Sequence, residues 1–246
     1  RSRGLGDVYK RQTLIFIDEI QACPQIVTFI KGLVDRGDYD YILSGSLLGV
    51  ELEDVRSLPV GYLDEFIMYP LDFEEFLWAN GIETPVIELL KTCLQNEKTV
   101  PEALHKRMKQ LLLQYTVVGG MPDVVQTFVS TKQMDEVLQI QRDIVRSYED
   151  DMIKYAEKKD KSRIKECFQS IPKQLSKENK KFQYSIVKKG STASKYAGSL
   201  QWIEDAGIIV CCYNLSITEL PLDGNAEENT FKVYMRDCGL FVSMLE

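Results

Sequence analysis

The first regular pattern in the sequence is a pair of short apolar runs separated by an amphipathic segment. Leu14–Ile17 are all apolar and lead directly into Asp18 and Glu19, and a second apolar run follows at Tyr41–Leu43. An uninterrupted apolar run of this length is typical of a fully buried parallel strand. Residues 24–36, between the two runs, begin with proline and repeat apolar side chains at helical spacing. The pattern therefore predicts two parallel strands joined by one helix.

Beyond residue 71 the apolar positions recur with mostly helical spacing. The sequence GGMP at 119–122 interrupts this pattern with two glycines ahead of Met-Pro, which predicts a tight, close-packed corner between helices. Helices are predicted over residues 72–80, 101–115, 133–155, 162–174 and 192–206, a strand over 207–215, and a strand followed by a helix over 229–246. The fold class that follows is α/β with a helical extension.

The composition fits a soluble globular protein and excludes some kinds of catalytic site. Hydrophobic residues make up 44% of the 246 residues, and the formal net charge is −7. No apolar run is long enough to span a bilayer, and the sequence contains no signal-peptide pattern. The six cysteines show no CxxC pairing and are interpreted as reduced thiols, so we expect a cytoplasmic protein. His105 is the single histidine, which excludes a histidine-based triad and a multi-histidine metal site.

The polar residues that end the two predicted strands are the candidate catalytic group. A charged pair at the end of a buried strand is costly unless a cation meets it, and in nucleotide-hydrolysing folds that cation is Mg²⁺. We expect Asp18 to hold Mg²⁺ through water and Glu19 to orient or deprotonate the attacking water. Ser44 and Ser46, at the exit of the second strand, would hydrogen-bond the γ-phosphate or that water. The alternative is an ordinary buried strand followed by a helix-capping Asp-Glu pair.

The order of several segments resembles a family of prokaryotic AAA-type ATPases. The segments are DEIQ (18–21), a proline-initiated helix, ILSGS (42–46), PLDFEEFL (70–77) and GGMPDV (119–124). In that family a P-loop ATPase module precedes a winged helix and a C-terminal domain of uncharacterised function, which resembles a restriction-endonuclease-like fold. The resemblance implies that DEIQ is the Walker B motif and SGS the polar sensor, with ATP and Mg²⁺ as cofactors and hydrolysis coupled to conformational change. The family often has Gly-Arg where this chain has Gly61 and Tyr62.

The phosphate-binding loop of such an ATPase is not in the printed sequence, because no GxxxxGK[ST] motif occurs in it. We therefore interpret the chain as a fragment, truncated at both ends and inactive alone. The sequence DVYKRQ at 7–12 resembles one frame of a transposon-derived sequencing adapter, so residues 1–12 are interpreted as an artefact. The expected domains are an ATPase core (13–80), a helical lid-like subdomain (81–153), a winged helix-like module (154–222) and the start of a truncated C-terminal domain (223–246).

Residues 154–195 form a basic segment in an otherwise acidic chain, with thirteen Lys and Arg against four Asp and Glu. In a winged helix this suggests contact with duplex DNA, because lysines gain affinity by releasing counterions from phosphates. The candidate contacts are Lys188, Lys189 and Lys195. The alternative is a solvated face that binds a protein partner, in a DNA- or protein-binding adaptor whose ATPase module is vestigial. Asp237 receives no catalytic role, because one carboxylate does not make a nuclease.

Overall fold

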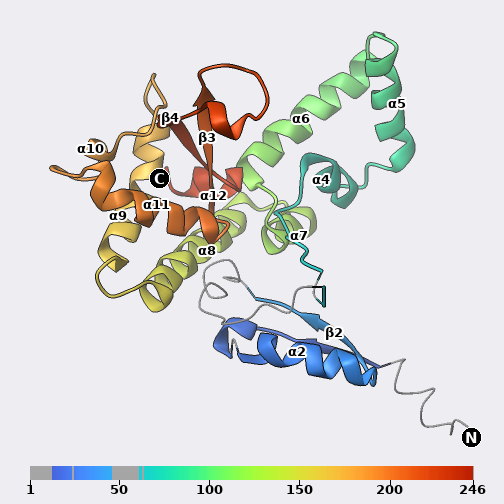
Figure 1. Cartoon of the computed structure of the whole chain (residues 1–246). Coiled ribbons are helices and arrows are strands. Elements are labelled where there is room, and N and C mark those ends of the chain that lie inside the picture. The colour runs from blue at the N-terminus through green and yellow to red at the C-terminus, as the bar shows by residue number, and fades with distance from the viewer. Residues whose placement is uncertain (1–12, 24, 46–60, 63, 246) are drawn as a thin grey trace, which may run out of the picture. The chain divides into compact units, whose positions relative to one another are not determined.

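The computed structural model describes residues 13–23, 25–45, 61–62 and 64–245 (Figure 1). The chain divides into two compact units, Arg1–Ile67 with Trp202–Gly207 and Met68–Gln201 with Ile208–Glu246. Among the helices in these described ranges, none is both long and apolar enough to cross a membrane.

The first unit contains the predicted strand–helix–strand order. Its elements are β1 (Leu14–Ile17), the short 3₁₀ helix η1 (Ile20–Ala22), α2 (Gln25–Arg36) and β2 (Asp40–Leu43). The two strands pair in parallel, with Ile17 opposite Leu43, which confirms the predicted parallel arrangement. Helix α2 connects them and buries Val27 and Ile30.

The prediction that the first strand is fully buried is wrong for the described structure. Leu14 and Phe16 are 55% and 59% exposed, while Ile15 and Ile17 are half-buried. Successive side chains of a strand point to opposite faces of a sheet, so this alternation means that one face of β1 is open to solvent. An apolar run cannot distinguish a strand covered on both faces from one covered on a single face, because the run itself has no polar positions to mark the open side.

The second unit begins with five helices around one apolar core. They are α4 (Phe73–Ala79), α5 (Thr84–Gln95), α6 (Glu102–Val118), α7 (Pro122–Thr131) and α8 (Met134–Tyr155). Phe76, Leu111, Val124 and Val137 come from four of these helices and are completely buried in the same cluster. The long helices and the Gly-Gly corner agree with the sequence predictions apart from small shifts at the helix ends, where assignments ordinarily vary.

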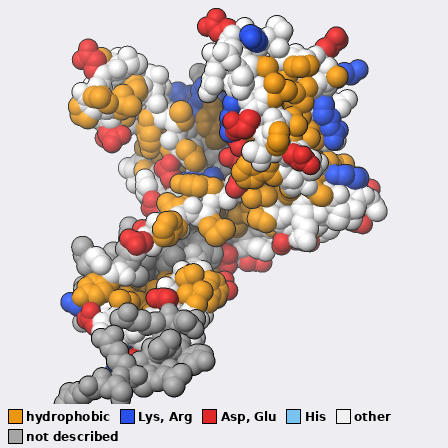
Figure 2. Space-filling model, turned by 90° about the vertical axis from the view of Figure 1, so that its right-hand side faces the viewer, with side chains coloured by type: hydrophobic (Ala, Val, Ile, Leu, Met, Phe, Trp, Pro, Cys, Tyr) orange, Lys and Arg blue, Asp and Glu red, His pale blue; other side chains and the backbone are white. Residues whose placement is uncertain are grey.

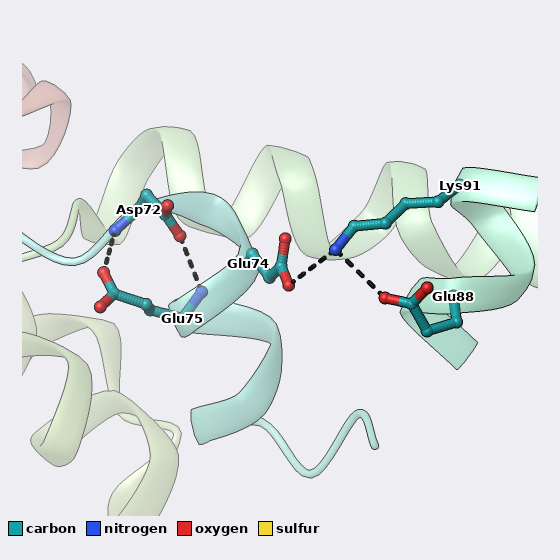
Figure 3. Close-up of polar contacts among 5 residues, drawn as sticks. All are labelled: Asp72, Glu74, Glu75, Glu88 and Lys91. Atoms are coloured by element: carbon teal, nitrogen blue, oxygen red, sulfur yellow. Dashed lines mark hydrogen bonds and ion pairs between the residues drawn. The ribbon is translucent and has the colours of Figure 1, made fainter. Parts of the chain in front are cut away.

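Polar contacts at the start of α4 fix its direction (Figure 3). The Asp72 carboxylate accepts a hydrogen bond from the Glu75 N–H at 2.9 Å, and the Glu75 carboxylate accepts one from the Asp72 N–H at 2.8 Å. This capping box satisfies two backbone donors that the first turn of a helix leaves without partners. The Nζ of Lys91, on α5, lies 3.3 Å from Oε1 of both Glu74 and Glu88 and so links α5 to α4.

The rest of the described chain contains three α-helices, a strand pair with a short 3₁₀ helix between its strands, and a last α-helix. Their bounds are α9 (Lys161–Leu175), α10 (Tyr184–Val187), α11 (Ala193–Asp205), β3 (Ile209–Leu215), η3 (Asp223–Asn225), β4 (Ala226–Met235) and α12 (Cys238–Ser243). Strands β3 and β4 pair antiparallel, and the loop between them projects from the second unit (Figure 1). Helix α12 packs against α6 and α8. In this structure β4 and α12 belong to the same compact unit as α6 and α8. The start of a truncated C-terminal domain at residue 223 stays a prediction.

Candidate functional site

The ends of β1 and β2 bring two of the predicted site residues together. Because Ile17 pairs with Leu43, the next residues, Asp18 and Ser44, leave the sheet side by side. The Ser44 hydroxyl donates a hydrogen bond to Oδ1 of Asp18. The backbone reinforces this placement, since the Ser44 N–H donates to the Ile17 carbonyl at 2.9 Å and the Ile20 N–H donates to the Ser44 carbonyl at 3.0 Å.

Glu19 occupies an unusual backbone conformation next to this pair. Its φ and ψ are 54° and 45°, in the left-handed region, and its N–H donates to Oδ1 of Asp18 at 3.0 Å. A residue with a side chain in this region is uncommon and costs of order 1 kcal/mol or more, and such outliers are frequent at functional sites. Asp18 and Glu19 form the turn between the end of β1 and the start of η1. Both acidic side chains are exposed.

The donor set at this edge fits a hard divalent cation. An exposed carboxylate and a hydroxyl, both oxygen donors, suit Mg²⁺, which uses one or two carboxylates and keeps several waters. Across the ranges that the structure describes, no three His, Cys, Asp or Glu side chains converge, so these residues contain no ready zinc-type cluster. Ser46, the fourth predicted residue, lies outside the described residues.

The three lysines predicted to contact nucleic acid have different surroundings. The Lys188 Nζ lies 2.6 Å from Oε1 of Glu166, and the Tyr196 hydroxyl donates to Oε2 of the same carboxylate at 2.6 Å. The Lys188 hydrogen bond, followed by that of Tyr196, lowers the pKa of Glu166. Lys188 is thus already paired with a carboxylate, whereas Lys189 and Lys195 are exposed on either side of the turn into α11.

A buried carboxylate that the sequence prediction left without a role, Asp237, joins two distant parts of the second unit. Asp237 is 4% exposed. Its Oδ2 accepts a hydrogen bond from the Gly120 N–H at 2.6 Å, and its Oδ1 accepts one from the Leu240 N–H at 2.8 Å. Burial raises the pKa of Asp237, while the backbone donors of Gly120, Leu240 and Gly239 oppose that rise. Asp237 therefore caps α12 and holds it to the corner between α6 and α7.

Two distant segments approach the backbone of the Gly-Gly corner closely, one at Leu71 and the other at Asp237. A Cβ on Gly119, whose φ is +75°, would lie 2.3 Å from Oδ1 of Asp237, and a Cβ on Gly120 would lie 2.0 Å from the Leu71 carbonyl oxygen. The Leu71 N–H donates to the Gly120 carbonyl at 2.7 Å, and the Tyr115 hydroxyl donates to the Leu71 carbonyl at 2.8 Å. The segments resembling family motifs, 70–77 and 119–124, are thus in direct contact.

The sequence contains a signal for Asp237 that the prediction did not use. An aspartate directly before the apolar run 238–242 has the pattern of a helix N-cap. That pattern predicts the bond to Leu240 but not the bond to Gly120, because the latter joins residues 117 positions apart. The buried location excludes Asp237 from contact with a substrate in this structure.

Comparisons with known proteins agree with an ATPase-like architecture. Residues 109–246 match a family model described as a domain of unknown function (DUF8612), and residues 3–77 match one described as an AAA domain. No curated protein matches the chain. The Walker-type ATPase of Pyrococcus abyssi aligns with a TM-score of 0.54 and 14% identity, over 94% of this chain and 62% of that one.

The AAA domain match supports the predicted relation to AAA-type ATPases for residues 3–77, and the likeness to the solved structure supports the predicted α/β fold. The likeness to the solved structure concerns the fold alone, and this chain spans about 62% of the length of that protein. The AAA match begins at residue 3, so the interpretation of residues 1–12 as an adapter artefact stays a prediction.

Proposed function

We propose that this chain, which belongs to the family of the domain of unknown function DUF8612, forms part of an ATP-hydrolysing protein. The AAA domain match over residues 3–77, which precedes the DUF8612 domain in the chain, supports the proposal. The proposal assigns binding of Mg-ATP to the edge where β1 and β2 end. Hydrolysis there would be coupled to a change in conformation of the helical part.

The single observation that supports this proposal is the hydrogen bond from the Ser44 hydroxyl to the Asp18 carboxylate, at the carboxyl edge of two parallel strands. Mg²⁺, when bound, would neutralise charge that develops on the transferred phosphoryl group. Asp18 would hold that ion through water, and the Ser44 hydroxyl would fix the orientation of the Asp18 carboxylate. Glu19 would orient the attacking water and accept its proton, and Ser46 would contact the γ-phosphate.

Tight nucleotide binding also needs a phosphate-binding loop, because its backbone N–H groups and lysine contact the β- and γ-phosphates. The printed sequence has no GxxxxGK[ST] motif. We propose that this loop lies outside these 246 residues, and that the 246-residue chain alone binds Mg-ATP only weakly.

The test compares two proteins by isothermal titration with Mg-ATP. The 246-residue chain should show no site in the micromolar range, whereas the gene product that includes the upstream loop should bind and hydrolyse ATP. An Asp18→Asn variant of the longer protein should lose Mg²⁺-dependent hydrolysis, while Asp150→Asn, an exposed change on α8, should not. A longer gene product without a lysine-bearing loop, or with turnover unaffected by Asp18→Asn, would contradict the proposal.

A second candidate function is an adaptor that contacts duplex DNA or a protein through a winged helix. It is favoured by the order α9, α10, α11 followed by the β3–β4 hairpin, and by the exposure of Lys189 and Lys195 beside α11. Lys188 contributes less in this proposal, because its ion pair with Glu166 must be broken before it can reach a phosphate.

Salt dependence of DNA binding tests the adaptor. If Lys189 and Lys195 each contact a phosphate, replacing both by alanine should lower the slope of log affinity against log salt by roughly two units. Lys158→Ala, a change of an exposed lysine in the same basic segment, should leave the slope unchanged. Equal slopes for the wild type and the Lys189/Lys195 variant would remove duplex DNA as the partner and leave a protein partner.

A further inference from the structure

The carboxylate of Glu166, on α9, is bound by side chains from the turn after α10 and from α11. Its Oε1 lies 2.6 Å from the Nζ of Lys188 and accepts a hydrogen bond from the Ser162 hydroxyl at 3.2 Å. Its Oε2 accepts one from the Tyr196 hydroxyl at 2.6 Å. Lys and Arg side chains occur at several places on the surface shown in Figure 2, so a lysine alone does not define a binding site. At Lys188 the important feature is a carboxylate that two hydroxyl groups already orient.

Glu166 thereby fixes the turn that leads into α11. Lys188 stands directly after α10, and Tyr196, which is 7% exposed, lies in the first turn of α11. Each of them is the chain neighbour of an exposed lysine, since Lys189 follows Lys188 and Lys195 precedes Tyr196. Three lysines therefore lie on one short stretch of chain, and Glu166 pairs with one of them.

The β3–β4 hairpin, next in the chain, has no positive charge over most of its length. Residues 213–231 include four acidic residues and no lysine, arginine or histidine. Acidic side chains are repelled by the phosphates of nucleic acids, so a DNA contact of this module depends on lysines outside that range. The number of free lysines beside α11 then has a measurable effect on DNA binding.

We propose that Glu166 limits the number of DNA phosphates that this surface binds, because it competes with a phosphate for Lys188. The inference rests on the adaptor function proposed above and concerns the same surface. While Glu166 holds Lys188, the contact is made by Lys189 and Lys195. When the carboxylate is removed, Lys188 becomes a third lysine for a phosphate.

The hydrogen bonds of Glu166 make it an effective competitor. An exposed ion pair between two flexible side chains usually contributes little, because both side chains lose conformational freedom. The Glu166 carboxylate is already oriented by Tyr196 and Ser162, so mainly Lys188 loses freedom when this pair forms. A glutamine at position 166 would still accept the hydrogen bond of the Tyr196 hydroxyl through its carbonyl oxygen, but it has no charge to hold Lys188.

The affinity of the 246-residue chain for duplex DNA, measured at several salt concentrations, gives the test. Glu166→Gln should bind more tightly and should increase the magnitude of the slope of log affinity against log salt by roughly one unit. Lys188→Ala should leave the slope of the wild type unchanged and should remove the additional unit in Glu166→Gln. A purely structural role of Glu166 predicts no such dependence on Lys188.

Glu149→Gln is the matched control for the loss of one negative charge. The Glu149 side chain is 22% exposed, against 24% for Glu166, and its Oε2 lies 3.0 Å from the Nζ of Lys165. The control change therefore also breaks a pair between a lysine and a half-buried carboxylate, but on α8 and away from the turn into α11. It should leave the slope unchanged, and thermal unfolding should show that all variants are folded.

The possible outcomes separate this inference from the adaptor proposal. If the wild type binds DNA and Glu166→Gln binds it with the same slope or more weakly, the inference is wrong and the adaptor stands. DNA binding by Glu166→Gln but not by the wild type would support the inference, whereas no binding by either protein would reject both. Lys188→Ala decides the point even if Glu166→Gln does not fold, because a smaller slope in Lys188→Ala would show that Lys188 already contacts a phosphate in the wild type.

Discussion

Glu19 has a left-handed backbone and lies two residues after the end of β1, next to Asp18, whose carboxylate accepts a hydrogen bond from the Ser44 hydroxyl. Glu19 is the N-cap residue of η1, but its side chain makes no capping hydrogen bond there. The catalytic role of Glu19 stays a prediction. Its proposed role as a base makes a prediction that separates binding from chemistry.

Glu19→Gln, in the gene product that includes the phosphate-binding loop, should leave ATP affinity nearly unchanged and slow hydrolysis by about 10² to 10⁴. Glutamine keeps the shape of the side chain but cannot accept the proton. Binding is measured by titration calorimetry and turnover by phosphate release. Glu97→Gln, a surface change on the second unit, serves as the control. Unchanged turnover in Glu19→Gln would remove this residue from the mechanism.

Asp237 makes a second prediction at the scale of one residue. Asp237→Asn should lower the free energy of unfolding by about 1–3 kcal/mol, because the NH2 group of the amide cannot accept one of the two N–H groups that the Asp237 carboxyl oxygens accept. Urea unfolding measures the change. Asp150→Asn, on the exposed face of α8, should change stability much less.

The sign of the pH dependence follows from the raised pKa of Asp237 in the folded protein. The folded state binds this proton more tightly than the unfolded state, whose carboxyl has its ordinary pKa of 3.8. The stabilising contribution is therefore complete below that value and is lost as the pH rises through the folded-state pKa. The decrease in the free energy of unfolding caused by Asp237→Asn should be largest at acid pH and should become smaller as the pH rises to neutral. A cost that grows with rising pH would contradict the assignment.

At the scale of elements, the corner between α6 and α7 depends on the absence of a side chain. Gly120→Ala should be strongly destabilising, because its Cβ would overlap the Leu71 carbonyl, which is backbone and cannot swing away. We expect a loss of about 3 kcal/mol or more, measured by thermal or urea unfolding.

A helical glycine in the same unit provides the matched control for that prediction. A Cβ on Gly198, in α11, would meet no atom within 4 Å. Gly198→Ala should therefore stabilise the protein by about 0.5–1 kcal/mol, through the better helix propensity of alanine. Equal effects of the two glycine replacements would show that the close approach of Gly120 to Leu71 is unimportant for the fold.

At the scale of the whole molecule, the last helix of the described chain, α12, completes the packing of the helices in the second unit. Leu240 of α12 is 1% exposed, and α12 packs on α6 and α8. A chain that ends at Met235 should lose the Asp237 bonds together with about 1.5–3 kcal/mol from the burial of Leu240. Its helices should unfold at a lower temperature by circular dichroism.

A chain that ends at Ser243 is the control for this truncation, because it keeps α12. If the chain ending at Met235 unfolds like the control, residues 223–246 do begin a separate domain, as the sequence predicts. If it unfolds earlier, α12 is part of the helical unit.

The sequence by itself determined the order and type of the main elements. Apolar runs and helical spacing are local properties, so they predicted the parallel strand pair, the long helices and the strand that precedes α12. The polar residues after each run also identified Asp18 and Ser44 as candidates, because residues that follow two parallel strands leave the sheet at the same edge.

Only the tertiary structure decided which residues meet across long distances in the chain. It showed one face of β1 exposed at Leu14 and Phe16, paired Lys188 with Glu166, and joined Asp237 to Gly120. Burial, ion pairing and close backbone approach depend on partners far along the chain, and periodicity has no information about such partners. For that reason the sequence predicted the elements, while the environment of each charged residue had to be read from the fold.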